Sequence, residues 1–253
     1  NPSSWGQLFG IGMYTYGRPK TPQFGLDYTT ISPNYDPYLG YAPETDLRSL
    51  SGTVQIYDQL AKGPLTYWNA YLSGDLTNHI NGSLFHKSIG LSTYVEWRKG
   101  TGISLYLDRE YRPPDQNSLI SLNVSWGQRS LYNNGSIGCG FGHQAGGDYL
   151  QYKIGESWGL ADRLNLYAGY SCARLKPPSR YAYKSSQLIS TLAYDFDNER
   201  TLAGRLVAEH GKTNFYLAYK QRVRSGMDAY IIFGDPNADS TRSFFALKLV
   251  RLL

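Results

Sequence analysis

The strongest constraint in this sequence is a two-residue period, clearest between Phe85 and Trp97. Odd positions in this window are mostly apolar: Phe85, Lys87, Ile89, Leu91, Thr93, Val95 and Trp97. Even positions are mostly polar: His86, Ser88, Gly90, Ser92, Tyr94, Glu96 and Arg98. Because successive side chains of a β-strand point to opposite faces of a sheet, this period predicts a strand with one apolar and one polar face.

The same period recurs along nearly the whole chain, in segments of about ten residues separated by turn residues. This spacing is typical of a membrane-spanning β-barrel, whose strands alternate lipid-facing apolar and interior polar side chains. The 253 residues include 23 Tyr and 27 Gly but only 2 Met, which suits strands and turns. The mean hydropathy of -0.43 is compatible with such alternation. No run approaches the roughly 18 apolar residues of a membrane helix, so any membrane span must be built from strands.

Turn residues divide the chain into about fourteen predicted antiparallel up-and-down strands, within a range of roughly 12 to 16. The strongest hairpin signals are Asn134-Gly135 and Lys99-Gly100. The predicted strands cover residues 5–16, 47–58, 65–74, 85–97, 103–107, 120–126, 136–143, 149–158, 163–174, 185–195, 200–209, 213–223, 228–234 and 241–252. Together they predict one domain, a single transmembrane β-barrel over residues 1–253.

Residues 17–46 form the longest predicted connection. Four prolines interrupt it: Pro22, Pro33, Pro37 and Pro43. Since proline cannot continue a strand ladder, we predict a long extracellular loop here, with room for a short hairpin near residues 26–31. An even strand count would place both chain ends on one side of the membrane. The connections predicted on that side are all short. The long connections at 17–46 and 175–184 both fall in the opposite, outer set.

The two cysteines, Cys139 and Cys172, are predicted on strands that have another strand between them. We therefore interpret them as free thiols on the apolar face rather than as a disulfide. The first five residues lack a charged and then apolar leader, so the chain is either mature or a fragment of something longer. Aromatic residues near strand ends fit interfacial girdles, although Tyr and Trp are also simply favoured in strands.

The closing segment 242–253, RSFFALKLVRLL, is an amphipathic strand at the end of the sequence. It resembles the terminal insertion signal of Gram-negative outer-membrane β-barrels of the porin-like type, which usually ends in an aromatic residue, where this chain has Leu253. The segment Asn34-Tyr35-Asp36-Pro37-Tyr38-Leu39-Gly40-Tyr41, followed by Asp46-Leu47-Arg48, is similar to a stretch in large outer-membrane proteins. Those proteins couple a carbohydrate-binding-like domain to a C-terminal barrel. This second resemblance implies that the chain is the barrel portion of such a protein.

If the polar face points inward, a set of charged side chains lines the interior. The predicted basic pore-lining residues are Arg98, Arg112, Arg129, Lys153, Arg174, Arg205, Lys220, Arg222 and Lys248. The predicted acidic ones are Glu96, Asp108, Glu110, Asp195 and Glu209. With a net charge of +5, this excess of basic residues would favour anions in a water-filled pore. The alternative is that opposed charges pair into a network that fills the interior.

An enzymatic function is not predicted. The four histidines, His79, His86, His143 and His210, are scattered, and no spacing indicates a metal site or a cofactor. The nearest catalytic candidate, His210 with Glu209 and Asp228, fails because strand parity puts Glu209 and His210 on opposite faces. No Lys/Arg cluster or motif indicates nucleic-acid binding.

These observations predict a channel in a bacterial outer membrane that passes small polar solutes, with a bias toward anions. Its expected partners are the outer-membrane lipid and lipopolysaccharide around it. The alternative function is a non-conducting barrel that anchors or houses a partner protein or binds a surface glycan through the loop at 17–46. A soluble all-β sandwich or lectin is a third possibility, which an apolar outer band at matching depth in every strand would exclude.

Overall fold

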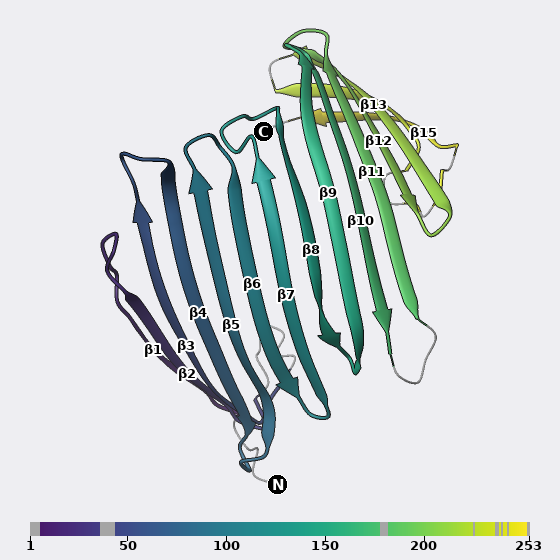
Figure 1. Ribbon diagram of the computed structural model, residues 1–253. Helices are drawn as coiled ribbons and strands as arrows, with labels where there is room; N and C mark the ends of the chain where they lie inside the picture. The colour runs from purple at the N-terminus through teal and green to yellow at the C-terminus, as the bar shows by residue number, and fades with distance from the viewer. Residues whose placement is uncertain are drawn as a thin grey trace. The chain divides into compact units, whose positions relative to one another are not determined.

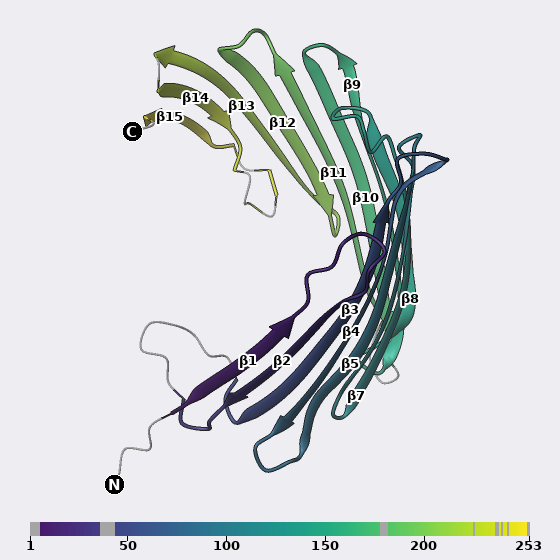
Figure 2. The ribbon, with the colours of Figure 1, turned by 90° about the vertical axis from the view of Figure 1, so that its left-hand side faces the viewer.

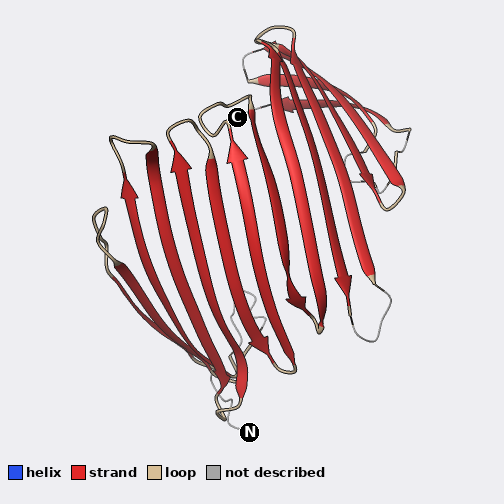
Figure 3. Ribbon diagram, viewed as in Figure 1, coloured by secondary structure: helices blue, strands red, loops and turns tan. Residues whose placement is uncertain are grey.

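The fold consists of β-strands. The computed structural model describes residues 6–35, 44–177, 182–224, 226–235, 238, 240–241 and 243–251, and every regular element among them is a strand (Figure 3). Over the same residues there is no helix long and apolar enough to cross a membrane. The strands are β1 (Leu8–Tyr14), β2 (Gln23–Ile31), β3 (Leu47–Gln59), β4 (Leu65–His79), β5 (Leu84–Trp97), β6 (Gly102–Arg112), β7 (Asp115–Trp126), β8 (Asn134–Gln144), β9 (Gly147–Ala161), β10 (Leu164–Lys176), β11 (Tyr183–Asp195), β12 (Arg200–Glu209), β13 (Lys212–Arg224), β14 (Met227–Phe233) and β15 (Phe245–Arg251).

Each strand pairs with the next one along the chain. The hydrogen-bonded order runs from β1 to β15 without a crossover, as the sequence of neighbouring strands β3 to β7 illustrates (Figure 1). The antiparallel up-and-down sheet predicted from the alternation is therefore confirmed. Among the described residues β1 and β15 each pair on one side only, so the closure of the sheet into a barrel stays a prediction.

Strand β2 corrects the prediction of one long loop at 17–46. All seven residues of β1 pair with β2, and β2 pairs with β3 from Gln23↔Gln55 to Ile31↔Leu47. The prolines that suggested a loop lie just outside the strand, at Pro22 and Pro33, where they cost no ladder hydrogen bond. The remaining connections cover residues 15–22 and 32–46, and residues 36–43, with most of the Asn34 to Tyr41 motif, lie outside the described residues.

With β2 added to the fourteen predicted strands, the described chain has fifteen. The odd count removes the argument that both chain ends lie on one side of the sheet, since each antiparallel strand reverses the direction. The last predicted strand, 241–252, is present as β15. Parts of its motif, Arg242, Leu252 and Leu253, lie outside the described residues, as do residues 1–5.

The chain divides into two compact units. Unit 1 comprises residues 1–123, 140–149 and 175–181, and unit 2 comprises residues 124–139, 150–174 and 182–253. Strands β1 to β6 belong wholly to unit 1, and strands β11 to β15 belong wholly to unit 2. Within unit 2, β12, β13, β14 and β15 follow one another side by side (Figure 2).

In unit 1 the register aligns apolar residues on one face of the sheet. One row crosses five strands from β2 to β6: Phe24, Val54, Leu72, Leu91 and Leu107. We call this side the apolar face of unit 1 and the opposite side, which carries Asp75 and Glu110, the polar face of unit 1. The alternation predicted over residues 85–97 is thus shared by neighbouring strands.

Unit 2 shows the same separation. A row on its apolar face crosses β11 to β15: Leu192, Gly204, Leu217, Phe233 and Phe245. The next row on this face is Tyr194, Leu202, Tyr219, Ile231 and Leu247. The opposite side, which carries Arg205 and Lys220, is the polar face of unit 2.

Among the described residues, no second layer of protein covers the apolar faces. Three hydrophobic side chains of the described residues are buried: Leu47, Cys172 and Ala218. By contrast, Ile89 is 54% exposed and Leu247 is 70% exposed. Soluble sheets bury their apolar face against another element, so this sheet leaves uncovered the surface that would normally drive folding in water.

Both cysteines are free, as predicted. Cys139 on β8 is exposed and Cys172 on β10 is buried, with β9 between the two strands. The rings of Tyr152 on β9 and Tyr170 on β10 lie 6.0 Å apart between their centroids. Alternation places Cys172 on the same face as Tyr170.

Candidate functional site

A cluster of hydrogen-bonded polar side chains surrounds His86 on the polar face of unit 1. The register brings His86 opposite Thr77, and the neighbouring position Ser88 opposite both Asp75 and Glu110. His86 Nδ1 lies 3.0 Å from Asp75 Oδ1, and Nε2 lies 3.1 Å from Glu110 Oε1. Because a carboxylate only accepts, both contacts are hydrogen bonds when the imidazole is protonated and donates from both nitrogens. The cluster then holds one cation between two carboxylates.

Hydroxyl groups complete the partners of Asp75. The Ser49 hydroxyl donates to Asp75 Oδ2 over 2.9 Å, and the Thr77 hydroxyl lies 2.9 Å from both Ser49 Oγ and Asp75 Oδ1. On the far side of the histidine, the Asn117 amide donates to Glu110 Oε2 over 3.2 Å. The network therefore joins β3, β4, β5, β6 and β7 by side-chain contacts in addition to their backbone ladders.

Arg112 lies beside this cluster at the end of β6. Its Nη2 donates to Glu44 Oε1 over 2.7 Å, and its guanidinium lies 4.6 Å from the ring centroid of Phe85. These side chains border a cavity of about 320 Å³ that His86 and Glu110 also line. Its lining also includes the apolar side chains of Ile31, Leu47 and Phe85, so the cavity offers both charged and apolar surface.

Tyrosines line the other end of the polar face of unit 1. The ring centroids of Tyr57 and Tyr67 lie 6.4 Å apart, and those of Tyr67 and Tyr94 lie 6.1 Å apart. Tyr71 and Tyr106 share this face by register, since both pair with Ser92. Phenol rings offer an apolar surface and a hydroxyl to any solute that passes along them.

The register also gives the polar face of unit 1 an acidic character. Five carboxylates occupy its paired positions on β1 to β6: Asp27, Asp75, Glu96, Asp108 and Glu110. Arg112 lies two residues after Glu110 on β6 and therefore points to the same face. Among the described residues of β1 to β6, it is the one arginine or lysine on this face. The excess of basic residues was predicted for the interior as a whole, whereas on the polar face of unit 1 the carboxylates are in the majority. Asp27 and Asp75 were absent from the predicted set because the predicted strands omitted β2 and ended β4 at residue 74.

The polar face of unit 2 is basic instead. Its paired positions on β11 to β15 carry Arg205, Lys212, Lys220, Arg222 and Lys248 against Asp195, Glu209 and Asp228. Arg205, Lys220, Arg222, Lys248, Asp195 and Glu209 thus share the face on which they were predicted. Asp228 lies 3.0 Å from Lys220 Nζ and 3.8 Å from Arg222 Nε.

A cavity of about 580 Å³ lies within unit 2 and is lined by Arg205 with Thr191 and Tyr216. Leu131 and Tyr132, from the connection between β7 and β8, line it as well. This connection is held to β9 because the Gly159 N–H donates to Asn133 Oδ1 over 2.9 Å. Arg205 has no ion-pair partner among the described residues, so its charge is available to a solute.

Four of the residues predicted to line the pore lie outside the paired strand positions described so far. Arg98 follows β5 in a connection, and its guanidinium donates to the backbone oxygens of Gly63 (2.9 Å) and Leu60 (3.0 Å). It therefore holds the β3–β4 connection rather than projecting from a strand. Arg129 lies in the connection between β7 and β8. Arg174 follows Tyr170 and Cys172 in alternation, whereas Lys153 is adjacent to Tyr152, so Arg174 and Lys153 lie on opposite faces.

The positions of the side chains around His86 and His210 do not match those of a catalytic group or a metal site. Ser49 donates to Asp75, and none of the hydrogen bonds of the described residues joins a hydroxyl group to the His86 imidazole. The two nitrogens of His86 point in opposite directions, each to its own carboxylate, so the three groups do not converge on one ion. No group of three metal-ligating side chains occurs in the described part of the chain. His210 follows the end of β12, and its Nδ1 lies 3.4 Å from Glu209 Oε1, so the prediction that strand parity separates these two side chains is wrong. Asp228, the third member of that candidate group, pairs with Lys220.

Comparisons with known protein families, with curated proteins and with solved structures found no match to this chain. The resemblance to outer-membrane barrels therefore rests on the strand pattern.

Proposed function

We propose that this chain forms the wall of a β-barrel in the outer membrane of a Gram-negative-type bacterium, through which small polar solutes pass passively. The observation that carries the proposal is the pairing of an uncovered apolar face with a charged polar face on the same strands, in both units. Lipid supplies the missing apolar layer, and water occupies the polar side.

The dimensions of the apolar face support a membrane span. On β5 the apolar face runs from Lys87 at one end to Trp97 at the other. Ten residue steps cover about 33 Å along a strand. A strand tilt of about 40° reduces this to about 25 Å, the height of the lipid-facing band of a membrane barrel. Trp97 then lies at headgroup depth, where aromatic rings are favoured.

A soluble sandwich is the weaker explanation. Such a fold would bury residues like Leu72, Ile89 and Leu247 against a second sheet, about 10 Å away. In the described residues these side chains are 42%, 54% and 70% exposed. An uncovered apolar surface that continues across five paired strands exceeds what soluble monomers tolerate.

The polar faces indicate the kind of solute. The tyrosines and carboxylates of unit 1 offer ring faces and hydrogen-bond acceptors to hydroxyl-bearing molecules. The basic face of unit 2 offers Arg205 and Lys248 to anions. Because the two faces differ in sign, a general preference for anions is no longer expected from the net charge alone.

A second candidate function is a non-conducting barrel. The hydrogen-bonded network around His86 favours it, since paired charges can fill an interior instead of leaving it open. In that case the barrel would act as an anchor or as the housing of a partner. The connection at residues 32–46, of which Glu44 contacts Arg112, would then be the part that meets the partner.

Single-channel recording in a planar bilayer tests these two functions. We expect the refolded chain to give stable conductance steps, with a reversal potential that Arg205→Glu and Lys248→Glu shift toward cations. The matched pair Glu96→Lys and Asp108→Lys, on the polar face of unit 1, should shift it toward anions. A silent protein that has nevertheless inserted would contradict the channel and favour the anchoring function.

A further inference from the structure

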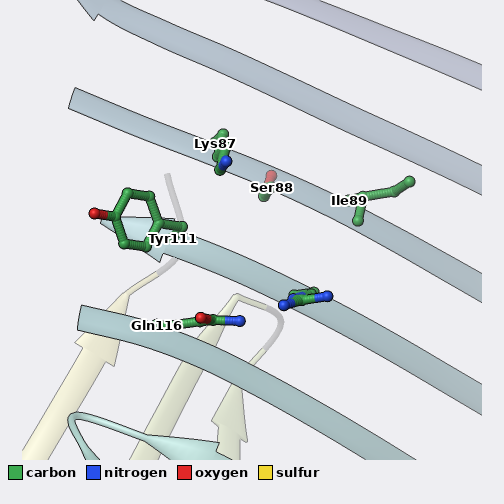
Figure 4. A pocket seen from close by; sticks show the side chains of 6 residues that line it. Lys87, Ser88, Ile89, Tyr111 and Gln116 are labelled. Atoms are coloured by element: carbon green, nitrogen blue, oxygen red, sulfur yellow. The ribbon is translucent and has the colours of Figure 1, made fainter. Parts of the chain in front are cut away.

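Two basic side chains lie on the apolar face of unit 1, next to each other on paired strands. Lys87 is on β5 and pairs with Tyr111 of β6, and Arg109 is two residues before Tyr111 and pairs with Ile89. Both side chains are exposed. Figure 4 shows Lys87, Tyr111 and Gln116 on neighbouring strands. Together with Ser88, Ile89 and Arg109 they line a cavity of about 510 Å³.

Neutral groups hold the two cations in place. Lys87 Nζ lies 5.3 Å from the centroid of the Tyr111 ring, a cation–π contact. In the amide orientation that satisfies both of its groups, Gln116 accepts from Arg109 Nη2 over 2.6 Å and from Nε over 3.0 Å. These contacts orient the positive charges without neutralising them.

Among the described residues, no carboxylate forms an ion pair with Lys87 or Arg109. At the register-paired positions of β1 to β6, the apolar face carries three cations, Arg48, Lys87 and Arg109. Its one carboxylate at such positions is Asp58, at the opposite end of β3, where it lies 3.6 Å from Lys20 Nζ. The three cations have no ion-pair partner among the described residues. No described carboxylate therefore forms an ion pair with these three charges.

All three cations lie toward the same end of their strands. Arg48 is the second residue of β3, Lys87 is the fourth residue of β5, and Arg109 is the fourth from the end of β6, which runs the other way. The residues that follow them toward the strand centres are apolar: Leu50, Ile89 and Leu107. In a membrane this is the depth at which long basic side chains reach the lipid headgroups.

From this placement, which rests on the membrane position proposed above, we infer that Lys87 and Arg109 form a binding site for the phosphate of an anionic membrane lipid. The guanidinium of Arg109 can engage two phosphate oxygens at once, and the ammonium of Lys87 adds a point charge beside it. Ile89 and Leu107 continue the site toward the bilayer centre, where the acyl chains of the same lipid lie. Charge and apolar surface thus match the two parts of one lipid molecule.

Phosphatidylglycerol is the probe for the test. The wild-type chain and the double variant Lys87→Ser/Arg109→Ser are refolded in detergent micelles, and bound phosphatidylglycerol is measured during titration by native mass spectrometry. Each basic residue near an anionic surface contributes about 1 kcal/mol, so losing both should weaken binding about 30-fold. The matched control is Lys62→Ser/Lys99→Ser, which removes two exposed lysines from connections at the other end of the strands and should bind as the wild type does.

A second variant separates a charge effect from a folding defect. Lys87→Arg/Arg109→Lys keeps both charges and should restore most of the binding. Insertion of each variant into phosphatidylcholine vesicles, followed by tryptophan fluorescence, reports folding independently of anionic lipid. Equal binding by Lys87→Ser/Arg109→Ser and wild type, or an equal loss in the control, would overturn the site. Failure of the wild type to insert into any vesicle would instead contradict the membrane position itself.

Discussion

The polar faces of the two units are built from the same alternation but carry opposite charge. In unit 1, carboxylates dominate, and two of them, Asp75 and Glu110, are tied to His86 in a network. In unit 2, basic residues dominate, and Asp228 pairs with Lys220 and Arg222 while Arg205 lines an open cavity. The net charge of +5 therefore describes neither face. Local sign depends on which residues the register brings together.

The two units also differ in how many partners hold their charged side chains. The carboxylate of Asp75 has partners on three strands, so its position is fixed by several weak bonds. Arg205 lies between Thr191 and Tyr216 in the register, and its side chain has no ion-pair partner among the described residues. Unit 1 thus resembles a structural network, whereas unit 2 leaves charge available for interaction.

The largest stability effect should come from the network of unit 1. Asp75→Ala leaves Ser49, Thr77 and His86 without their shared acceptor, and each lost bond is worth about 1 kcal/mol. We expect a loss of about 3 kcal/mol in the free energy of unfolding, measured by urea titration in lipid vesicles. Ser51→Ala, at the position paired with Asp75, should cost less than about 0.5 kcal/mol. Equal small losses in both variants would show that the network contributes little.

A smaller loss is expected for the ion pairs of unit 2. Asp228→Asn leaves the charges of Lys220 and Arg222 without a carboxylate in a site where the Asp228 side chain is only 14% exposed. We expect a loss of about 2 kcal/mol in the same urea titration, less than for a fully buried pair. Asp162→Asn, in the exposed connection between β9 and β10, is the matched control and should leave stability unchanged. If Asp228→Asn stabilised the protein, the pairing would have to be unfavourable overall.

The smallest effect should be the pH dependence of the β11–β12 connection in unit 2. The guanidinium of Arg200 donates to Asp197 over 2.7 Å, and the N–H groups of Glu199 and Arg200 donate to the same carboxylate, which lowers the pKa of Asp197. A lowered folded-state pKa gives stability that is present above the unfolded value of about 3.9 and is lost as the pH falls through the folded value.

The difference in urea midpoint between wild type and Asp197→Asn should therefore be present at neutral pH, shrink as the pH falls below about 4, and disappear below the lowered folded-state pKa. Glu199→Gln, in the same connection, should show no such convergence. A constant difference between wild type and Asp197→Asn across this range would mean that the carboxylate charge has no role in holding the turn.

Much of the fold could be predicted from the sequence because alternation is a property of each strand alone. The fourteen predicted strands are all present, and the residues grouped on one face of β12 to β15 do share it. Strand β2 was missed because Pro22 and Pro33 were taken as marks of a loop, although they lie outside the alternating residues Phe24, Leu26 and Tyr28. Alternation bounded by prolines was the signal that could have found it.

The site was harder to predict because it depends on pairing between strands. Nothing in the spacing of Asp75, His86 and Glu110 along the chain indicates that they meet, and only the register brings them together. Arg98 shows the opposite error. Its parity suggested a polar face, but it lies beyond the end of β5 and donates to the backbone oxygens of a neighbouring connection.

The edges of the sheet set a condition on any membrane state. In the described residues β1 and β15 each have a single neighbour, so one side of each strand keeps its N–H and C=O groups without a ladder. Water satisfies such groups, but hydrocarbon does not, and each one left bare there costs several kcal/mol. Membrane insertion would therefore have to coincide with the pairing of β1 and β15 at their open edges. These two strands could enter the bilayer only together with the strands that satisfy their free backbone groups.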